Sequence, residues 1–503
     1  MSSHGYHVLI LGGGVAGLTT AMALIKCAPP HLLPKVDIFE IRDEPGTVGG
    51  AINLTPNALR LLDYLGVYQI IKDRQYGITV DAVEVFSVYS HQKLAESSFR
   101  GPNNQGIGSP PYKAIRITRA SLMHALIAAL SDHPNITLHL GHRAASITET
   151  STSVTVSFNA HPPHTGDILL GCDGVHSFTR NHHVDPTRRQ LYTGVANAFG
   201  FAPLSASDRA AAHFETSALN FSRHGLLLTS YHEPTRTSGY VGAILATPDV
   251  GSREGWRARS IDRDAVRRDV MGRFGSEAGC VLPSVRTFIE KAADWFLWPV
   301  YMVPEGGTGK WATGRTMLLG DAAHAMPPQG ESTGIVLEDT VLLARCLLAN
   351  QLLHDSGSSD SGSSDSGGST GKDDSVTVIK EAFDAYENLR RGRITAACKE
   401  SMAVVHSVAA TGKWGFWLKT SIAIPIFLRL GQAKRIRHFE EDVTTCALGF
   451  GEQMEQNRLV VVPTAGVKGV VSSVLARMGD AWRRGGLWRL LWMLVSGRHH
   501  WLR

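Results

Sequence analysis

The sequence predicts an α/β protein built on a doubly wound, Rossmann-type sheet, and two observations carry this prediction. Four apolar residues typical of a buried strand run into a GxGxxG motif formed by Gly12, Gly14 and Gly17, and apolar residues then continue at helical spacing. A second strand-like run, residues 36–39, ends in Glu40, 23 positions after Gly17. Strand, glycine turn, helix and acidic residue in this order are typical of dinucleotide binding.

Each part of this motif has a physical task. One glycine makes the tight turn, one lets a pyrophosphate approach the backbone, and one lets the helix pack on the strand. The first helical residues, Val15 and Ala16, offer free N–H groups and the positive end of the helix dipole to the phosphates. Glu40 is placed to accept hydrogen bonds from an adenosine ribose. The alternative is a glycine-rich turn with a structural role only.

The remaining elements suggest interleaved domains. Thr118 is a plausible N-cap for a helix that begins at Arg119. Residues 188–300 read mostly as strands, with one helix near 262–274. A run of Ser, Gly and Asp cannot bury a core and predicts disorder. We therefore expect a discontinuous dinucleotide-binding domain (1–75, 115–185 and 301–352), an inserted, mostly β substrate domain (76–114 and 186–300), a disordered loop (353–375) and a helical C-terminal region (376–503).

Composition narrows the classes of function. The chain has 503 residues with 43% hydrophobic and 19% charged residues, which are the values of a globular protein. The formal net charge of +5 is small for this length and predicts no nucleic-acid partner. Six cysteines without a CxxC pair argue against zinc and against a disulfide framework, so we expect no metal site and a reduced, cytoplasmic location. The first strand starts too early for a preceding signal peptide.

Two apolar stretches bear on membrane contact. Residues 420–430 are apolar but short and contain Pro425, and residues 482–503 mix tryptophans with arginines. No window is long enough for a certain transmembrane helix. Trp and Arg together suit a membrane surface, so the C-terminal region allows peripheral membrane contact. The alternative, which we favour, is a helix packed on the protein's own body.

Further glycines and acids follow other expected strands. The loop before a helical run contains Gly50, Ala51 and Asn53, and later strands end at Asp173-Gly174 and at Asp321. Strand ends from distant segments gather at one edge of a doubly wound sheet. These groups would therefore meet one extended, two-ended ligand such as FAD. The alternative is that the two aspartates only cap turns.

Three motifs in one order point to a family. GxGxxG is followed by DGVHSFTR at 173–180 and by GDAAHAMPP at 320–328. In this respect the chain resembles the FAD-dependent group A flavoprotein monooxygenases, the para-hydroxybenzoate- and salicylate-hydroxylase-like enzymes, and within them the fungal natural-product tailoring type. The resemblance covers roughly residues 6–400. One departure is Glu331, where the family usually has glutamine, and we expect this acid to act as a helix cap.

The resemblance implies a role for each matching residue. Glu40 would hold the ribose, and Arg119 would contact the FAD phosphates or the ribityl region. Asp321 would accept hydrogen bonds from the ribityl chain, and Asp173 would help to hold the cofactor and guide the nicotinamide. The helix beginning near Gly334 would direct its N-terminus at the flavin pyrimidine. The expected FAD-binding set is Gly12, Gly14, Val15, Ala16, Gly17, Glu40, Gly50, Ala51, Asn53, Arg119, Asp173, Gly174, Asp321 and Gly334.

The resemblance also implies the reaction. FAD, with NAD(P)H as co-substrate and O2, would hydroxylate or epoxidise an aromatic, polyketide or terpenoid-type small molecule through a C4a-hydroperoxyflavin, in secondary-metabolite biosynthesis. Alternatives on the same fold are an FAD-dependent halogenase or dehydrogenase, or a non-catalytic escort protein. His324 is expected to be structural. No catalytic side chain is singled out among the candidates in the substrate domain, which are His213, His224, Tyr231, His232 and Tyr240.

Overall fold

The computed structural model describes residues 5–46, 49–304, 309–357, 374–408 and 410–449. Residues 1–448 form one compact unit. Most of the expected disordered loop, 358–373, and the Trp/Arg segment 482–503 lie outside the described residues.

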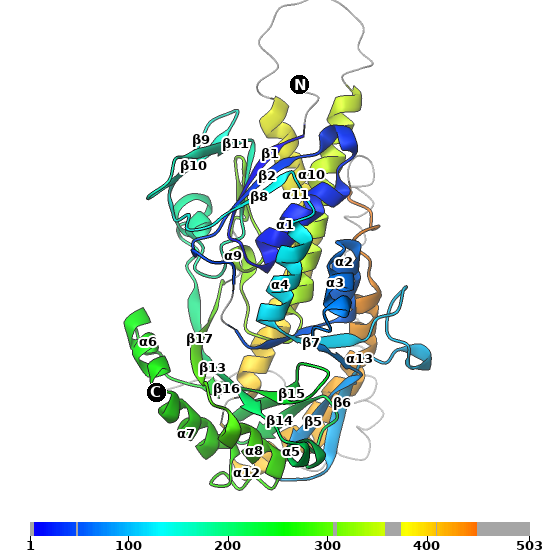
Figure 1. Cartoon of the computed structure of the whole chain (residues 1–503), viewed down its shortest axis with the longest axis vertical. Helices are drawn as coiled ribbons and strands as arrows, with labels where there is room; N and C mark the ends of the chain where they lie inside the picture. Colours follow the sequence, from blue (N-terminus) through cyan, green and yellow to red (C-terminus); the bar gives the residue numbers. More distant parts are fainter. Residues whose placement is uncertain (1–4, 47–48, 305–308, 358–373, 409, 450–503) are drawn as a thin grey trace, which may run out of the picture. The chain divides into compact units, whose positions relative to one another are not determined.

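A six-stranded sheet carries the glycine motif (Figure 1). Its central strands pair in parallel, and only the edge pair β18–β19 is antiparallel. Strands from all three segments expected in the dinucleotide-binding domain contribute to it. In spatial order they are β18 (Ala312–Thr313), β19 (Thr316–Leu318), β12 (Ile168–Gly171), β1 (His7–Leu11), β2 (Lys35–Phe39) and β8 (Ile136–His139).

A seven-stranded sheet forms the other large layer. Most of its neighbouring strands are antiparallel, but β14 and β5 run parallel. Its strands, in spatial order, are β17 (Phe296–Met302), β13 (Leu191–Pro203), β16 (Ser238–Ala246), β15 (Gly225–Tyr231), β14 (Ser217–Ser222), β5 (Ala82–Ser87) and β6 (Lys93–Ser98).

Two small sheets complete the strand layers. One has the order β3 (Ala51–Leu54), β7 (Ala114–Thr118) and β4 (Ile78–Val80). The other has the order β11 (His164–Gly166), β10 (Val154–Phe158) and β9 (Ala144–Glu149), and its apolar residues pack with Leu9 and Phe39 of the six-stranded sheet.

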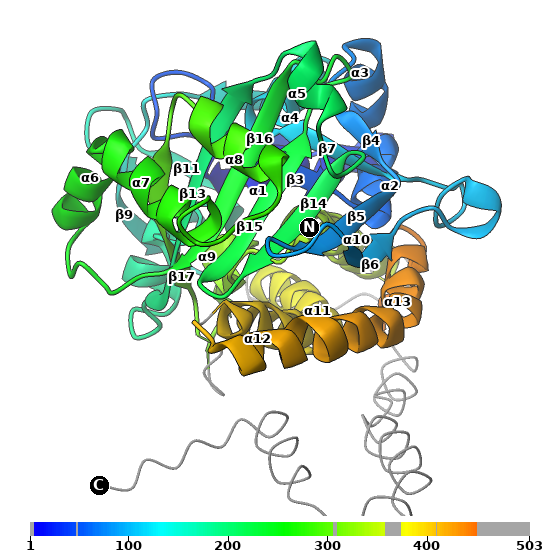
Figure 2. The same cartoon turned by 90° about the horizontal axis from the view of Figure 1, so that it is seen from below.

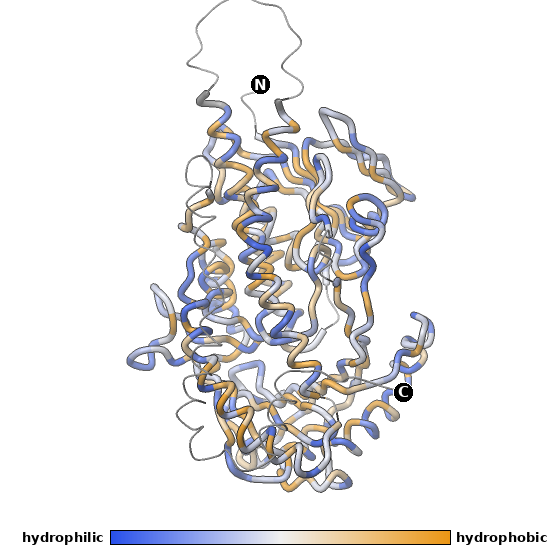
Figure 3. The backbone as a smooth tube through the Cα atoms, turned by 180° about the vertical axis from the view of Figure 1, so that it is seen from behind, coloured by the Kyte–Doolittle hydropathy of each residue, from blue (hydrophilic) through white to orange (hydrophobic). Residues whose placement is uncertain are grey.

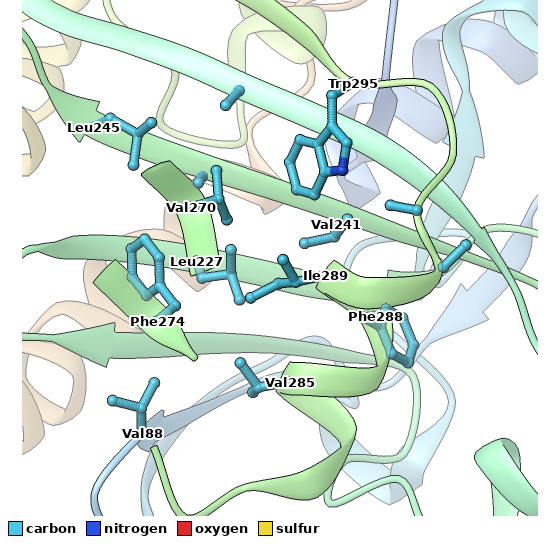
Figure 4. Packing of buried hydrophobic residues seen from close by; sticks show 14 of the residues in the cluster. Val88, Leu227, Val241, Leu245, Val270, Phe274, Val285, Phe288, Ile289 and Trp295 are labelled. Carbon is cyan, nitrogen blue, oxygen red and sulfur yellow. The ribbon is translucent and has the colours of Figure 1, made fainter. Parts of the chain in front are cut away.

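Each face of the seven-stranded sheet has a different covering. Helices α7 (Arg263–Phe274) and α8 (Pro283–Lys291) close one face over an apolar core that includes Leu227, Phe274 and Trp295 (Figure 4). On the opposite face, Phe199 and Tyr240 pack with Ala51 of β3. This second face therefore meets the strand that follows the Gly49–Gly50 loop.

Several helices pack around the six-stranded sheet, and further helices follow in the C-terminal part of the described chain. Helix α1 packs on α4 and α10, and α10 also packs on α2 and α11. Apolar and polar positions are interleaved along the long helices (Figure 3). The bounds are α1 (Val15–Cys27), α2 (Pro56–Tyr64), α3 (Val67–Asp73), α4 (Arg119–Leu130), α9 (Asp321–His324), α10 (Ser332–Gly357) and α11 (Asp374–Ser407).

The last described helices are α12 (Lys413–Leu418), a π-helical turn η4 (Lys419–Ala423) and α13 (Ile424–Glu440). They run beside the seven-stranded sheet (Figure 2). Phe416 of α12 joins a core with Val85 and Phe221. None of the helices in the described part of the chain is long and apolar enough to cross a membrane.

Two expectations about elements are corrected. Residues 188–300 hold three helices besides α7, namely α5 (Ala206–Ala210), α6 (Arg253–Ile261) and α8. Capping groups start them: Ser205 and Ser252 accept backbone hydrogen bonds, and Pro283 is the first residue of α8. Helix α10 extends to Gly357, so the first five residues of the expected disordered loop are helical. In contrast, Thr118 caps α4 as predicted, because its hydroxyl accepts the Ser121 N–H at 3.0 Å.

Candidate functional site

The glycine turn between β1 and α1 has the geometry of an anion cradle. Gly12 has φ +110°, and its N–H donates to the Phe39 carbonyl at 2.8 Å. A Cβ on Gly17 would lie 1.9 Å from the Gly12 carbonyl oxygen, so only glycine fits there. A Cβ on Gly14 would meet nothing within 4 Å. Neither a side-chain cap nor an acidic residue occupies the first turn of α1, which leaves its N–H groups, including those of Val15 and Ala16, available to phosphates.

Glu40 lies at this turn. One carboxylate oxygen accepts the Gly13 N–H at 2.9 Å, and the other accepts the Arg42 N–H at 3.1 Å. The carboxylate is therefore fixed beside the glycine motif by backbone donors, at the end of β2 where the spacing predicts it.

A second group of predicted residues comes from β3 and the start of α4. The Arg119 N–H donates to the Gly50 carbonyl at 3.1 Å, and Ala51 begins β3. The Arg119 side chain is exposed and forms no hydrogen bond or ion pair with a described residue. The Asn53 side-chain oxygen is buried and has no hydrogen-bond partner in the described chain. The exposed Arg119 guanidinium and the unpartnered Asn53 oxygen both follow from the segment around Gly50. Together they fit a cofactor that carries anionic groups and hydrogen-bond donors.

Asp321 is the first residue of α9 and is exposed, without a side-chain partner among the residues that the structure describes. The preceding residue, Gly320, lies against both the glycine motif and α10, since its Cβ would be 3.5 Å from Ala16 and 3.2 Å from Val336. The fold thus brings Asp321 close to the start of α1, although the two are far apart in the sequence. Gly334, in the first turn of α10, lies against Thr55 and Asn57.

Asp173 is placed differently from the other predicted acids. Its carboxylate accepts hydrogen bonds from the Ser177 hydroxyl at 2.5 Å and from the Thr179 N–H and hydroxyl at 2.8 and 2.9 Å. Burial raises the pKa of Asp173. The Asp173 carboxylate therefore bonds residues of its own turn. This is the arrangement expected if Asp173 only caps a turn. Gly174 in the same turn has φ +75°.

A buried ionic network, which the sequence analysis missed, holds the start of α10. Arg390 of α11 donates to Glu338 at 2.9 Å and to Asp339 at 2.8 Å. Asn57 donates to the other oxygen of Glu338 at 2.7 Å, and His324 lies 2.9 Å from Asp339. Although burial alone would raise it, the charges of Arg390 and His324 hold the pKa of Asp339 below its usual value. His324 is thus bonded within this buried network, and its structural role stays a prediction.

Glu331 precedes α10 and is matched by cations. Its carboxylate oxygens lie 3.7 Å from an Arg393 nitrogen and 3.5 Å from an Arg435 nitrogen, and its backbone carbonyl accepts the Ile335 N–H. Glu331 is the residue that departs from the family pattern, and its negative charge is thus offset by Arg393 of α11 and Arg435 of α13.

Arg116 of β7 is a buried cation that lies against the face of the seven-stranded sheet on which Phe199 and Tyr240 pack with β3. It is buried, its Nε donates to the Ser230 hydroxyl at 3.2 Å, and its guanidinium lies 5.1 Å from the centre of the Tyr240 ring. It forms no ion pair with any carboxylate in the described residues. Burial lowers the pKa of Arg116 to about 10, so it remains charged at neutral pH. An unmatched buried charge is costly and points to a ligand.

Two of the substrate-domain candidates share this face. Tyr240 packs with Phe199 and Phe201, and His232 lies edge-on to Phe201. Burial lowers the pKa of His232 to about 4, and its Nδ1 has no partner in the part of the chain that is described. His213 and Tyr231 instead pack on the opposite face of the sheet, where His213 bonds Ser284 and Asn220.

Comparisons with known proteins agree with this geometry. Residues 5–351 match the family described as FAD binding domain. Salicylate hydroxylase of Pseudomonas putida is 28% identical over 357 residues, covering 68% of this chain and 76% of that protein. FAD-dependent monooxygenase penM of Penicillium crustosum is 24% identical over 368 residues, covering 69% and 70%. The structure of Klebsiella pneumoniae HpxO complexed with FAD and uric acid gives a TM-score of 0.64 at 20% identity over 87% of this chain and 96% of that chain.

The chain therefore belongs to the FAD-binding-domain family. It is an FAD-dependent monooxygenase of the group A flavoprotein type, with NAD(P)H as the co-substrate typical of that family. The fold class, the family resemblance and the FAD cofactor predicted from the sequence are confirmed.

Proposed function

We propose that this monooxygenase hydroxylates or epoxidises an aromatic, polyketide or terpenoid-type small molecule that carries an acidic group, in secondary-metabolite biosynthesis. The observation that carries the proposal is the buried guanidinium of Arg116 without a carboxylate partner in the described chain. A carboxylate, phenolate or enolate of the substrate would supply the missing negative charge. Relatives of the chain include salicylate hydroxylase, the fungal monooxygenase penM and a 3-hydroxybenzoate 6-hydroxylase of Klebsiella oxytoca, which supports this substrate class.

The side chains around Arg116 suit a planar, apolar substrate body. Phe199, Phe296 and Trp298 stack or meet edge to face on the same side of the sheet. Aromatic walls bind flat rings through offset-stacked and edge-to-face contacts. His232, which its low pKa keeps neutral at pH 7, could accept or donate a proton near the ring without competing as a charge.

We also propose which residues hold the cofactor. Gly12, Gly14, Val15, Ala16 and Gly17 would receive the pyrophosphate, with Glu40 at the ribose. The remaining proposed contacts are Gly50, Ala51, Asn53, Arg119, Asp173, Gly174, Asp321 and Gly334. The segments 1–75, 115–185 and 301–352 would form the FAD-binding domain, and 76–114 and 186–300 the substrate domain. When bound, FAD supplies oxidation–reduction chemistry with NAD(P)H and O2 that no side chain can supply.

A substrate panel tests the function. The purified protein is assayed for NAD(P)H consumption with phenols, enols and alkenes, each in an acidic form and as its methyl ether or ester. We expect acidic members to accelerate consumption and one atom of oxygen from 18O2 to enter the product. NAD(P)H consumption with label absent from every product would contradict the proposal, because the electrons would then only reduce O2 to H2O2.

Replacing Arg116 with methionine should separate substrate binding from stability. We expect the Kd of an acidic substrate, measured by flavin difference absorbance, to rise about 10- to 100-fold, since a hydrogen bond to a charged group contributes about 1.5–3 kcal/mol. The thermal midpoint should not fall, because the variant removes an unpaired buried charge. Lys113→Met, which breaks a partly exposed ion pair with Asp81, is the control and should bind substrate normally. Equal losses for acidic and neutral analogues would contradict a role for charge.

We further propose that the enzyme is cytoplasmic and contacts an anionic membrane surface through α12–α13. Large apolar side chains are exposed along these helices, with Trp414 84%, Phe427 63% and Leu430 70% exposed. Exposed cations, including Lys413 and Arg429, lie on the same helices. Apolar and basic residues on one helical surface favour anionic lipid interfaces. All six cysteines are free, which suits a reducing compartment.

Vesicle co-sedimentation tests this surface. The full chain should bind vesicles that contain phosphatidylserine, and the triple substitution Trp414→Ser, Phe427→Ser, Leu430→Ser should weaken binding at least about 10-fold, because burying each such side chain contributes about 1.5–3 kcal/mol. A matched control replaces three exposed apolar residues elsewhere, Leu191, Ile261 and Leu353, by serine. Equal binding by both variants, or dimerisation that only the first variant loses, would contradict a lipid partner for α12–α13.

A further inference from the structure

Histidines gather around a buried carboxylate beside the six-stranded sheet. Asp37 of β2 has a side chain only 4% exposed, and its two oxygens lie 2.6 Å from His7 Nε2 and 2.7 Å from His139 Nε2. His164 of β11 lies close by, with its ring centre 5.1 Å from that of His139. The potential ligand atoms of Asp37, His139 and His164 all lie within 4.8 Å of one another. Nothing in the proposed flavin chemistry uses these residues.

We propose that Asp37, His139 and His164 form a binding site for a divalent transition-metal ion of the zinc class. Two imidazoles and one carboxylate are a ligand set used by zinc sites that keep an open position for water. The three ligands stand on three regular strands, β2, β8 and β11, so their backbone positions are well defined. The ion would replace the hydrogen bond that now joins Asp37 and His139.

The surroundings supply an outer shell. His7 holds the second oxygen of Asp37, as partners of ligating carboxylates do. Phe39 stacks on His139 at 4.9 Å and meets His164 edge-on at 4.8 Å, which fixes the imidazole planes. The Lys35 ammonium lies 3.4 Å from Asp37, but its side chain is 64% exposed and free to move into solvent.

A metal ion at this site would link the three-stranded sheet β11–β10–β9 to the strand β2, which leads to Glu40. The Glu40 N–H donates to the His139 carbonyl at 2.8 Å, and the His142 N–H donates to the Glu40 carbonyl at 2.9 Å. A metal ion that joins β2, β8 and β11 would hold the backbone from which Glu40 emerges. Its occupancy should therefore stabilise the protein without taking part in oxygen transfer.

Zinc titration of the full-length, FAD-loaded, untagged protein tests the proposal. After dialysis against a chelator, we expect one equivalent of Zn2+ to bind with a micromolar or lower Kd in competition with a chromophoric chelator, and to raise the thermal midpoint. His164→Gln and Asp37→Asn should lose this equivalent, and His7→Gln should weaken it about 10- to 100-fold. His182→Gln, at an exposed histidine outside the cluster, is the control and should bind as the wild type does.

A spectroscopic measurement guards against misfolded variants. With Cu2+ in place of Zn2+, electron paramagnetic resonance should show two coordinated imidazole nitrogens in the wild type and one in His164→Gln. Flavin content and circular dichroism report whether each variant is folded. The proposal is overturned if the folded wild type binds no zinc in the micromolar range. It is equally overturned if His164→Gln retains the same affinity and nitrogen count.

Discussion

Arg390→Met is expected to lower the free energy of unfolding by about 3–5 kcal/mol, because it leaves Glu338 and Asp339 buried without their cation. Both carboxylates are at most 3% exposed, so water cannot replace the lost hydrogen bonds. Urea unfolding of the FAD-loaded protein, followed by circular dichroism and by flavin fluorescence, measures the change.

A control on the same helix separates burial from charge. Lys380→Met removes an exposed ion pair with Asp384 at i,i+4 and should change stability by no more than about 0.5 kcal/mol. Adding Glu338→Gln to Arg390→Met should restore part of the loss, since one unpaired charge is then removed. Similar small effects for Lys380→Met and Arg390→Met would show that the buried network contributes little.

Gly17→Ala should reduce FAD binding at least tenfold, a loss that requires only about 1.4 kcal/mol of strain. The new Cβ would lie 1.9 Å from the Gly12 carbonyl oxygen, and Gly12 is itself packed closely on the Cys172 carbonyl, since a Cβ built on Gly12 would lie 2.3 Å from that oxygen. The turn must therefore open. The flavin-to-protein ratio after purification and the thermal midpoint of the flavin-free protein measure the two consequences, and both should fall.

Two further glycines give matched comparisons. A Cβ on Gly14 would meet open space, and the φ of Gly14 is −83°, which alanine also adopts. Gly14→Ala should therefore leave the flavin-free protein as stable as the wild type, but it should lower the FAD content. Gly392→Ala, inside α11 where a Cβ meets nothing within 4 Å, should retain FAD and gain up to about 1 kcal/mol of stability. Normal FAD content in Gly14→Ala would contradict a cofactor that approaches the backbone there.

Local patterns account for what the sequence predicted well. The glycine turn and Glu40 belong to one β–α–β unit (β1, α1 and β2), and the Thr118 cap lies at a single strand–helix junction. The three motifs also indicated the family and the FAD cofactor. The individual FAD contacts remain predictions, and Asp173, which bonds its own turn, is the weakest of them.

Long-range pairs account for what was missed. Arg390 meets Glu338 and Asp339 across more than fifty residues, and the Asp37–His139–His164 cluster joins three strands. No sequence spacing encodes such contacts. Arg116 did carry a local signal, since it stands between Ile115 and Ile117 in a mostly apolar strand. A charge in the middle of such a strand either faces solvent or needs a partner, and only the pairing of β7 with its neighbours shows that it is buried.

The strand order of the six-stranded sheet governs how the chain can fold while it is being synthesised. Strand β1 pairs with β12, and β12 pairs with β19, so residue 11 leaves the ribosome roughly 15 to 60 s before residue 318 at 5–20 residues per second. During this interval the edge of β1 and then that of β12 stay open to other chains. Exposed apolar strand edges promote aggregation. Expression at lower temperature, or with chaperones that shield the nascent chain, should therefore raise the yield of folded enzyme more than added FAD, because the sheet that carries the glycine motif is complete only after β19 has been synthesised.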